Sequence, residues 1–378
     1  MDFHVSEDDR QFLKDVTAFV DDEVIPVADK MDAAEQYPGE LVDRMRQLGF
    51  FSASSRCLVT YSLALEELAR GWLSLIPIAN AHTSSVWTLK HHGTPGQQAG
   101  WLPDLLSGAI ISCLALTEPH GGSDLQNIRS TARRTTAGWV IDAHKTLITH
   151  SDHSDSMLIL ARTDEHVQGH RGLSLFLLKR DEWVVQRKLP KLGTKGIETC
   201  ELKVQGVEIP HDRLVGGQTG KGFGQVMDAL EVGRIAVASA AVGVGRSALW
   251  NAVEYIRQRE AFGTRVADMP AVRSDVAKVG NQLAAAKALT LWSAVLKQNG
   301  GRHDVETSSA KVVATDAAVA ASLKAMELAG GNGYTEDYRF ARILRDTALF
   351  LAGEGSNGVL NSLIGSRLVS GEKNLAWI

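Results

Sequence analysis

Apolar and polar residues recur along the chain with two different periods, and this divides it into three regions. Over residues 1–110 the apolar positions recur every three or four residues, the period of a helix, as at Phe12, Val16 and Phe19. Capping residues, prolines and glycines separate the helical segments. The predicted helices begin at Ser6 and Gly93 and span 38–48 and 61–70, with a largely apolar, buried segment over 76–91. We expect an N-terminal helical domain over residues 1–110.

Residues 111–217 follow a strand pattern. Short runs of alternating or β-branched residues are separated by glycines such as Gly138, Gly172 and Gly193. The predicted strands cover residues 110–116, 139–143, 157–161, 173–178 and 200–204. Several short strands at this spacing indicate a middle domain built as a β-barrel or sandwich.

The helical period returns in residues 218–378. Long Ala-rich helices are predicted over 223–257, 271–297 and 304–328, and a final helix from about Gly355. Four helices joined by short loops indicate a four-helix bundle. Gly243 and Gly245 lie inside the first of them, where each costs about 1 kcal/mol relative to Ala. We therefore expect a neighbouring helix to approach closely at these two positions.

The order of the three regions sets the fold class. Helices, then strands, then helices again exclude a doubly wound α/β fold, in which strands and helices alternate. The sequence predicts an α+β protein that is mostly helical. Its glycine motifs are weak indications of a dinucleotide-binding Rossmann site, because no strand–helix–strand unit surrounds them.

Charge and cysteine usage narrow the class of protein. The chain has 40 basic and 44 acidic residues, a net charge of −4, whereas a nucleic-acid-binding protein usually carries a basic excess. No run of about 18 uncharged apolar residues is present to span a membrane. Residues 1–10 are acidic where a signal peptide is basic and then apolar. Cys57, Cys113 and Cys200 have no zinc-ligand spacing, so we expect free thiols, no metal and a cytoplasmic protein.

Three features carry candidate chemistry, and each has a plainer explanation. Gly121 and Gly122 either form a tight turn or line a flat cofactor with backbone N–H groups. Arg234 and Arg259 are either solvated helix charges or anion-binding groups. Glu354 lies between glycines and next to the apolar residues 349–351. It is either a first-turn helix carboxylate or a buried base with a perturbed pKa.

Several segments together resemble the acyl-CoA dehydrogenase family. Residues 116–124 read LTEPHGGSD, 257–263 read RQREAFG, 327–334 read ELAGGNGY, and Arg345-Asp346 follows. They are similar to the family's TEPxxGSD, RxxFG, GGxGY and RD segments, and they occur in the family's order over nearly the whole chain. The resemblance implies an N-terminal helical domain, a β-barrel and a four-helix bundle, the order predicted above.

The resemblance also implies an FAD site. In the family the first segment binds the pyrimidine edge of FAD, and its Ser also contacts the phosphate or pantetheine region. A later WIT segment packs on the flavin, and the RxxFG and GGxGY segments reach the FAD of a neighbouring subunit. The residues implied here are Leu116, Thr117, Gly122, Ser123, Ile148, Thr149, Arg259, Phe262, Glu327, Gly330, Gly331 and Ser356. Glu327 replaces a common Gln, so we expect its carboxylate to point away from the diphosphate.

The same resemblance implies Glu354 as the catalytic base, since residues 353–355, Gly-Glu-Gly, are similar to the family's YEG segment. Other members carry the base on the long helix, one residue before an Arg, and here that position is Gly233. Arg234 is implied in binding the acyl-thioester arm, together with Ser123, Glu354 and Gly355. The implied reaction removes the α-proton of an acyl thioester and transfers the β-hydride to flavin N5. The implied partners are an acyl-CoA or acyl-carrier-protein substrate, an electron-acceptor flavoprotein or oxygen, and further copies in a homotetramer.

Some positions depart from the family pattern. Leu147 replaces the Trp of WIT, Pro270 and Gly358 replace Gln residues, and residues 51–60 lack the family's loop near the substrate entrance. The sequence therefore indicates a divergent member. Two alternatives stay open at this point: a flavin-dependent monooxygenase on the same fold, in which the base is typically absent, and a non-catalytic flavin-binding subunit.

Overall fold

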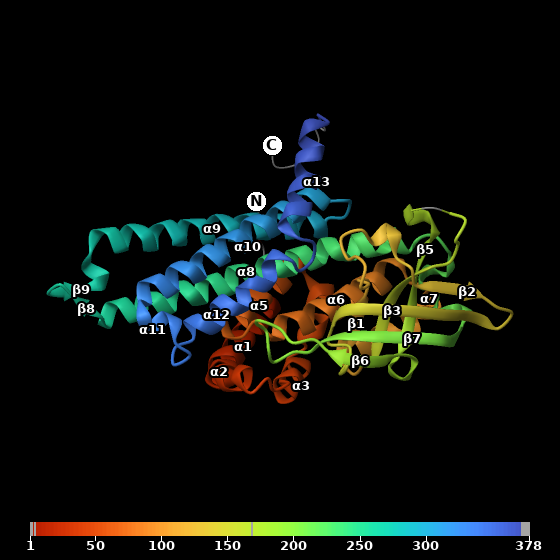
Figure 1. Cartoon of the computed structure of the whole chain (residues 1–378), viewed down its shortest axis with the longest axis horizontal. Coiled ribbons are helices and arrows are strands. Elements are labelled where there is room, and N and C mark those ends of the chain that lie inside the picture. The colour runs from red at the N-terminus through yellow and green to blue at the C-terminus, as the bar shows by residue number, and fades with distance from the viewer. Residues whose placement is uncertain (1–2, 4, 168, 372–378) are drawn as a thin grey trace.

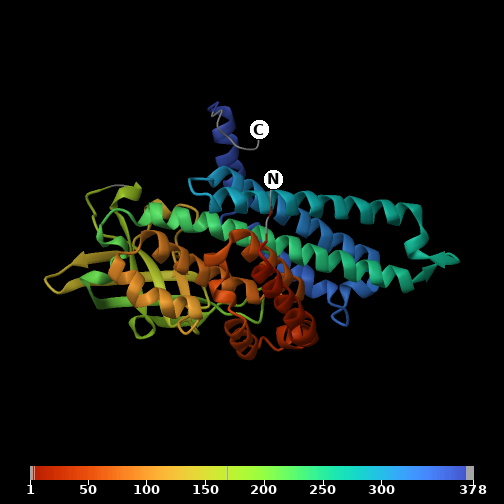
Figure 2. The ribbon, with the colours of Figure 1, turned by 180° about the vertical axis from the view of Figure 1, so that it is seen from behind.

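The computed structural model describes residues 3, 5–167 and 169–371. The expectation that the chain has no signal peptide was based on residues 1–10. Of these, residues 1, 2 and 4 lie outside the described range. The molecule is elongated, with a β-sheet at one end and long helices running to the other (Figure 1). The view from behind shows the N-terminal helices packed beside the middle of the long ones (Figure 2).

The N-terminal region is helical, as predicted. Ser6 caps the first helix, because its Oγ accepts a hydrogen bond from the backbone N–H of Asp9 at 3.1 Å. Pro26 lies in the first turn of the second helix, where a missing N–H costs little. A π-helical turn over Val20–Val24 joins these two helices. The α-helices are α1 Glu7–Phe19, α2 Ile25–Ala33, α3 Gly39–Gln47, α4 Ala53–Arg56, α5 Leu58–Gly71, α6 Leu75–His92 and α7 Pro95–Ser107.

The middle region forms one curled, mixed sheet of seven strands in the order β1-β4-β2-β3-β7-β6, with β5 also paired to β4. The strands are β1 Ser112–Ala115, β2 Thr131–Arg134, β3 Gly138–Thr149, β4 Ser156–Arg162, β5 Leu173–Lys179, β6 Val184–Lys188 and β7 Thr199–Pro210. Strands β1 and β4 are parallel, and β3 pairs with β7 antiparallel. The sequence pattern missed β2 and β6, which are short, largely polar or charged, and mostly lack buried side chains.

Over its described residues, 218–371, the C-terminal region has three long α-helices and three shorter ones: α8 Gly222–Gln258, α9 Pro270–Gln298, α10 Asp304–Ala329, α11 Gly331–Tyr334, α12 Phe340–Thr347 and α13 Asn357–Val369. A small hairpin, β8 Glu260–Ala261 with β9 Thr264–Arg265, joins α8 to α9. The predicted final helix is α13, which stands away from the long helices in both views (Figures 1 and 2). Helices α11 and α12 were not predicted. No helix among the described residues has the length and apolar character needed to cross a membrane.

The first and last regions share one hydrophobic core. Buried residues of α5, such as Leu65 and Leu68, belong to the same cluster as Ile235 and Ala240 of α8. The sheet has a separate core that includes Trp139. Helix α8 is the element against which α5, α6, α9 and α10 all pack.

The glycines inside α8 explain how closely the helices pack. A β carbon on Gly243 would lie 2.0 Å from the backbone oxygen of Glu66 in α5. One on Gly245 would lie 2.5 Å from Cδ2 of Leu283 in α9. The predicted close approach is confirmed at both positions.

Gly243→Ala is expected to lower the melting temperature of the protein. The added methyl group would overlap the backbone of α5, and overpacking of this kind costs about 1–3 kcal/mol. Gly224→Ala in the same helix is the matched control, since no atom lies within 4 Å of its added carbon. Thermal unfolding followed by circular dichroism should show a loss for the first variant and none for the second. Equal melting temperatures would contradict the packing described here.

Candidate active site

Glu354 lies in a short loop between a 3-10 turn, Ala348–Leu351, and α13. Its φ is +54°, and that of Gly355 is +90°. A left-handed conformation is uncommon for a residue with a side chain. Residues that adopt this conformation are found preferentially at functional sites. Here it turns the carboxylate inward, toward α6 and α8.

The Glu354 carboxylate has one hydrogen-bond partner and one free oxygen. Asn80 of α6 donates from Nδ2 to Oε1 at 2.8 Å. Oε2 is buried and has no partner among the described residues. Gly233 of α8 faces it, because a β carbon on that glycine would lie 2.8 Å from Oε2. The position on α8 where other family members are expected to carry a base is therefore adjacent to the carboxylate of Glu354.

Burial raises the pKa of the Glu354 carboxyl above its ordinary value by removing water from the charged form. The positive charge of Arg234, the hydrogen bond from Asn80 and the positive charge of Lys311 act in the opposite direction. A carboxylate whose pKa lies closer to neutrality is a stronger proton acceptor than an exposed one. Its electrostatic setting is that of a general base.

Arg234 is not a surface charge. Its side chain lies on α8 with only 7% of its surface exposed, and its Nε has no hydrogen-bond partner among the described residues. Buried charges are normally paired or bound to a ligand. The positive charge of Arg234 acts on the pKa of Glu354, so a buried guanidinium whose Nε has no partner in the described part of the chain lies near the candidate base.

The predicted cofactor residues of the sheet region come together at one edge. The backbone N–H of Thr146 donates to the carbonyl oxygen of Thr117 at 3.0 Å, which joins the glycine-rich segment to the end of β3. Ile148 packs into the core of the sheet, whereas Leu147 has φ +58° and is 60% exposed. Ser123 is exposed as well.

This edge has the chemical character that a flavin ring requires. A large apolar side chain, Leu147, is exposed there, two residues before the half-buried Thr149, and the preceding residue, Thr146, bonds to the segment that follows β1. Gly122 allows that segment to fold tightly, because a β carbon there would lie 3.1 Å from Cγ2 of Thr117. The residues present fit a flat ring with a polar edge.

The remaining predicted cofactor residues lie elsewhere. Arg259 follows the last residue of α8, and Phe262, at the tip of the β8–β9 hairpin, is 99% exposed. Glu327 forms an ion pair with Lys324 at 2.7 Å, so its carboxylate is already partnered. No atom lies within 4 Å of a β carbon built on Gly330 or Gly331, so the space around this turn is open.

The length of α8 separates this group from Glu354. Gln258 follows Gly233 by 25 residues along the helix, which corresponds to about 37 Å at 1.5 Å per residue. The hairpin and α11 lie at the opposite end of the molecule from the sheet (Figure 1). One chain therefore brings Glu354, Gly355 and Arg234 together, but it does not bring Arg259, Phe262 or Gly331 near them.

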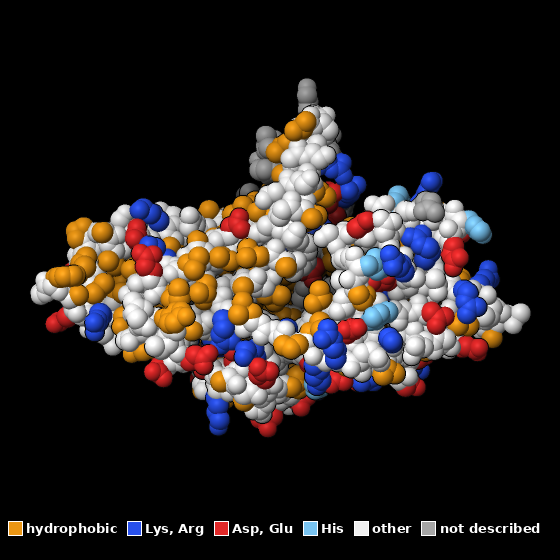
Figure 3. Space-filling model, viewed as in Figure 1, with side chains coloured by type: hydrophobic (Ala, Val, Ile, Leu, Met, Phe, Trp, Pro, Cys, Tyr) orange, Lys and Arg blue, Asp and Glu red, His pale blue; other side chains and the backbone are white. Residues whose placement is uncertain are grey.

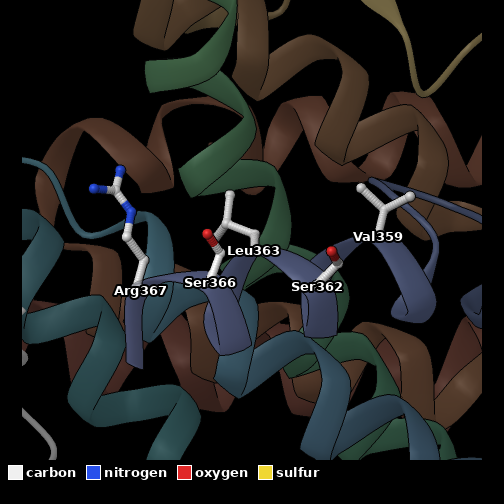
Figure 4. A pocket seen from close by; sticks show the side chains of 5 residues that line it. All are labelled: Val359, Ser362, Leu363, Ser366 and Arg367. Carbon is white, nitrogen blue, oxygen red and sulfur yellow. The ribbon is translucent and has the colours of Figure 1, made fainter. Parts of the chain in front are cut away.

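Two features near α13, the predicted cofactor residue Ser356 and a surface hollow, are explained by the local structure. Ser356 caps α13, where its Oγ accepts from the N–H of Val359 at 3.4 Å. A hollow along α13 is lined by Val359, Ser362, Leu363, Ser366 and Arg367 (Figure 4). Its charged residue, Arg367, is paired with Asp304 at 3.3 Å, so we do not place the active site there.

The sequence reasoning missed three side chains that hold the site. Asn80 contacts the base, Lys311 bonds to the loop of the base, and Lys145 bonds to the carbonyl oxygen of Leu116 at 3.0 Å. Asn80 and Lys311 are polar residues in apolar or Ala-rich surroundings, which is a signal that such a residue has a specific partner, whereas Lys145 lies between His144 and Thr146 and carries no such signal. Within the described part of the chain, no cluster of His, Cys, Asp or Glu is arranged to hold a metal ion.

Comparison with known proteins identifies the family that the sequence resembles, and the matches extend over nearly the whole chain. Residues 6–109, 113–207 and 220–369 match the N-terminal, middle and C-terminal domain models of acyl-CoA dehydrogenase. An acyl-CoA dehydrogenase of Bacillus subtilis is 32% identical over 97% of this chain and 100% of its own.

Solved structures agree with the predicted fold class. The butyryl-CoA dehydrogenase of Megasphaera elsdenii superposes with a TM-score of 0.94 at 30% identity, over 98% of this chain and 100% of its own. The prolyl acyl carrier protein oxidase AnaB superposes with a TM-score of 0.92 at 25% identity, over 97% of this chain and 100% of its own. The fold predicted from the sequence is confirmed, and the chain belongs to the acyl-CoA dehydrogenase family.

Proposed function

We propose that this protein dehydrogenates an acyl thioester, removing a proton from the α carbon and a hydride from the β carbon to leave a trans-2,3-enoyl thioester. The observation that carries the proposal is the Glu354 carboxylate. It is buried against Gly233, and Asn80 holds it through one oxygen, while its other oxygen has no partner in the part of the chain that the structure describes. A proton acceptor in this state is what abstraction of a weakly acidic α-proton requires.

The loop of the base offers a second group to the substrate. Among the described residues, the backbone N–H of Glu354 has no acceptor. We assign it to the thioester carbonyl, where a hydrogen bond stabilises the charge that develops on oxygen as the α-proton leaves. Arg234, buried beside the base with a free Nε, is assigned to the polar part of the thioester arm.

The cofactor proposed is FAD, on which the family generally depends. Leu116, Thr117, Gly122, Ser123 and Thr149 would hold the flavin ring, with Leu147 against its face. When bound, FAD supplies the hydride acceptor. The electrons would then pass to an acceptor flavoprotein or to oxygen.

The substrate is assigned by class. Relatives named for acyl-CoA and for an acyl carrier protein share this fold. Both carriers present the acyl group through the same pantetheine thioester, and we propose acyl-CoA as the first substrate to test. The monooxygenase alternative loses support because a buried carboxylate with a free oxygen is present where that class typically lacks a base.

We also propose that the protein is a homo-oligomer, a tetramer by family resemblance. Arg259 and Phe262 follow the end of α8, about 37 Å along the helix from Gly233, and Gly331 precedes Asn332, which bonds to Tyr255 in the last turn of α8. They can therefore complete a cofactor site only on another copy. Apolar side chains gather over the long C-terminal helices and up α13 (Figure 3). The exposed large ones in this region include Trp250, Phe262, Leu323, Tyr334, Leu349, Leu351 and Val359. A patch of this kind marks an interaction surface.

Glu354→Gln should abolish reduction of the flavin by substrate while leaving FAD bound. The amide keeps the volume but cannot accept the proton, and losing a positioned base costs about 10²–10⁴ in rate. Rapid-mixing absorbance of the oxidised flavin under anaerobic conditions measures this. A variant that keeps more than about a tenth of the wild-type rate would remove Glu354 as the base.

Moving the base to α8 is the matched recovery test. A side chain at Gly233 would collide with Glu354, so Gly233→Glu is combined with Glu354→Gly, which also suits the positive φ. Partial recovery relative to Glu354→Gly alone is expected. If a folded double variant that contains FAD shows no recovery, the proposal that a base at position 233 can replace one at position 354 is wrong.

The pH dependence of kcat/KM should show an acid limb that belongs to Glu354. Because burial raises its pKa, activity should fall as pH drops through a value above the ordinary Glu value of about 4.3. Asn80→Leu removes a hydrogen bond that favours the carboxylate, so its limb should move to higher pH. Ser84→Ala is the control, because its hydroxyl bonds only to the backbone of Asn80. An Asn80→Leu limb that does not move, or that moves to lower pH, would contradict the assignment.

Light scattering of the FAD-containing protein should give a multimer. Phe262→Asp should lower the affinity for FAD, because the exposed aromatic side chain is assigned to the cofactor of a neighbouring copy. Val184→Asp is the control, an exposed apolar residue of β6 that is assigned to no interface. A monomer with full FAD occupancy would refute the proposed assembly.

A further inference from the structure

Lys311 of α10 is fully buried, and its ammonium group binds the loop that carries Glu354. It donates to the carbonyl oxygens of Phe350 and Gly355 at 2.8 and 2.9 Å, and to Oδ1 of Asn357 at 2.7 Å. An ammonium has three N–H donors, so each of them is used. The three acceptors lie on both sides of Glu354 in the chain.

Asn357 extends this attachment to the next turn of α10. Its Nδ2 donates to Oγ1 of Thr315 at 3.0 Å and to Oδ1 of Asp316 at 2.8 Å. The loop is thus fixed to one face of a long helix at Lys311, Thr315 and Asp316. On its other side, the N–H of Gly353 bonds back to the carbonyl oxygen of Leu349 at 2.9 Å.

The loop needs such an attachment because its backbone is strained. Glu354 has a positive φ, which is unfavourable for a residue with a β carbon, and such a conformation persists only where the surroundings over-determine it. Between the 3-10 turn and α13 no regular backbone pairing is present to do this. The hydrogen bonds from Lys311 to residues 350, 355 and 357 supply the constraint.

We propose that Lys311 is a positioning residue for proton abstraction: it holds the loop so that the Glu354 carboxylate lies over Gly233. This inference rests on the proposed function, in which Glu354 is the base. Burial lowers the pKa of Lys311 to about 8, so the side chain is mostly protonated at neutral pH and keeps all three donors.

A second buried lysine provides a matched control. Lys145 of β3 is also fully buried, and it donates to the carbonyl oxygen of Leu116 at 3.0 Å and to Oε1 of Glu118 at 2.8 Å. It holds the proposed flavin edge and has no bond to the loop of Glu354. Removing Lys145 should therefore impair FAD binding, whereas removing Lys311 should impair the base.

The first test is Lys311→Met, which keeps the length of the side chain and removes its donors. Flavin reduction at saturating acyl-CoA should fall about 10²-fold, since a misplacement of about 1 Å has this effect on rate. FAD affinity should remain close to that of the wild type. Lys145→Met should show the opposite pattern, with weakened FAD affinity.

The second test separates positioning from general stability. In the Gly233→Glu, Glu354→Gly background the base lies on α8 and does not depend on the loop. There Lys311→Met should change the rate by no more than about twofold, because two changes that act through the same loop are coupled and their effects do not add. An equal loss in both backgrounds, or no loss in the wild-type background, would overturn the proposal.

The third test needs neither activity nor cofactor. Amide hydrogen exchange of residues 350–357 should be faster in Lys311→Met than in the wild type and unchanged in Lys145→Met. Asn357→Ala removes only one of the side chains that attach the loop to α10, so it should give a smaller increase in exchange at the same residues. If Lys311→Met does not fold, the exchange of Asn357→Ala is the test of the proposal. Unchanged exchange in the folded variants would overturn the proposal.

Wild type and Glu354→Gln are assayed in parallel. A wild type that acyl-CoA does not reduce, or a Glu354→Gln variant as active as the wild type, refutes the proposed function. Loop exchange reports on Lys311 independently of that result.

Discussion

The contact between the Glu354 carboxylate and the bare backbone of Gly233 is the constraint on which the rest of the site depends. The carboxylate reaches its place only because α8 carries no side chain there. Helix α8 is in turn fixed by its glycines against α5 and α9, and α6 supplies Asn80 from the N-terminal region. Small residues along α8 consequently determine both how the shared core packs and where the base lies.

Buried charge is the second theme of the structure. Glu354, Arg234, Lys311 and Lys145 all lie where water is largely excluded, and each such group is costly unless it is paired or hydrogen-bonded. Lys311 uses all three of its donors, and Lys145 is held by a carbonyl oxygen and a carboxylate oxygen. Arg234 Nε and Glu354 Oε2 have no hydrogen-bond partner among the described residues. The unsatisfied groups are those assigned to the substrate, and the satisfied ones hold the backbone around them.

The sequence predicted what depends on periodicity and on local motifs. The long helices, five of the seven sheet strands and the close packing at Gly243 followed from the pattern, and the segment around Glu354 followed from family resemblance. The edge strand β6 was missed because its exposed residues carry no alternation. Asn80 and Lys311 were missed because their partners are 274 and 44 residues away, and only folding brings them together. The distance between Arg259 and Glu354 also follows only from the folded structure, in which Glu354 lies against Gly233 and Arg259 follows the far end of α8.

The account's central claim is that the Glu354 carboxylate takes a proton from the α carbon of an acyl thioester. The most direct measurement is the rate of flavin reduction with an acyl-CoA carrying deuterium at the α carbon, compared with the unlabelled compound. The account predicts slower reduction with the α-deuterated substrate, in the wild type and also in the variant whose base has been moved to position 233. An identical rate for the two substrates in single-turnover reduction, with the substrate bound and the flavin oxidised at the start, would contradict it.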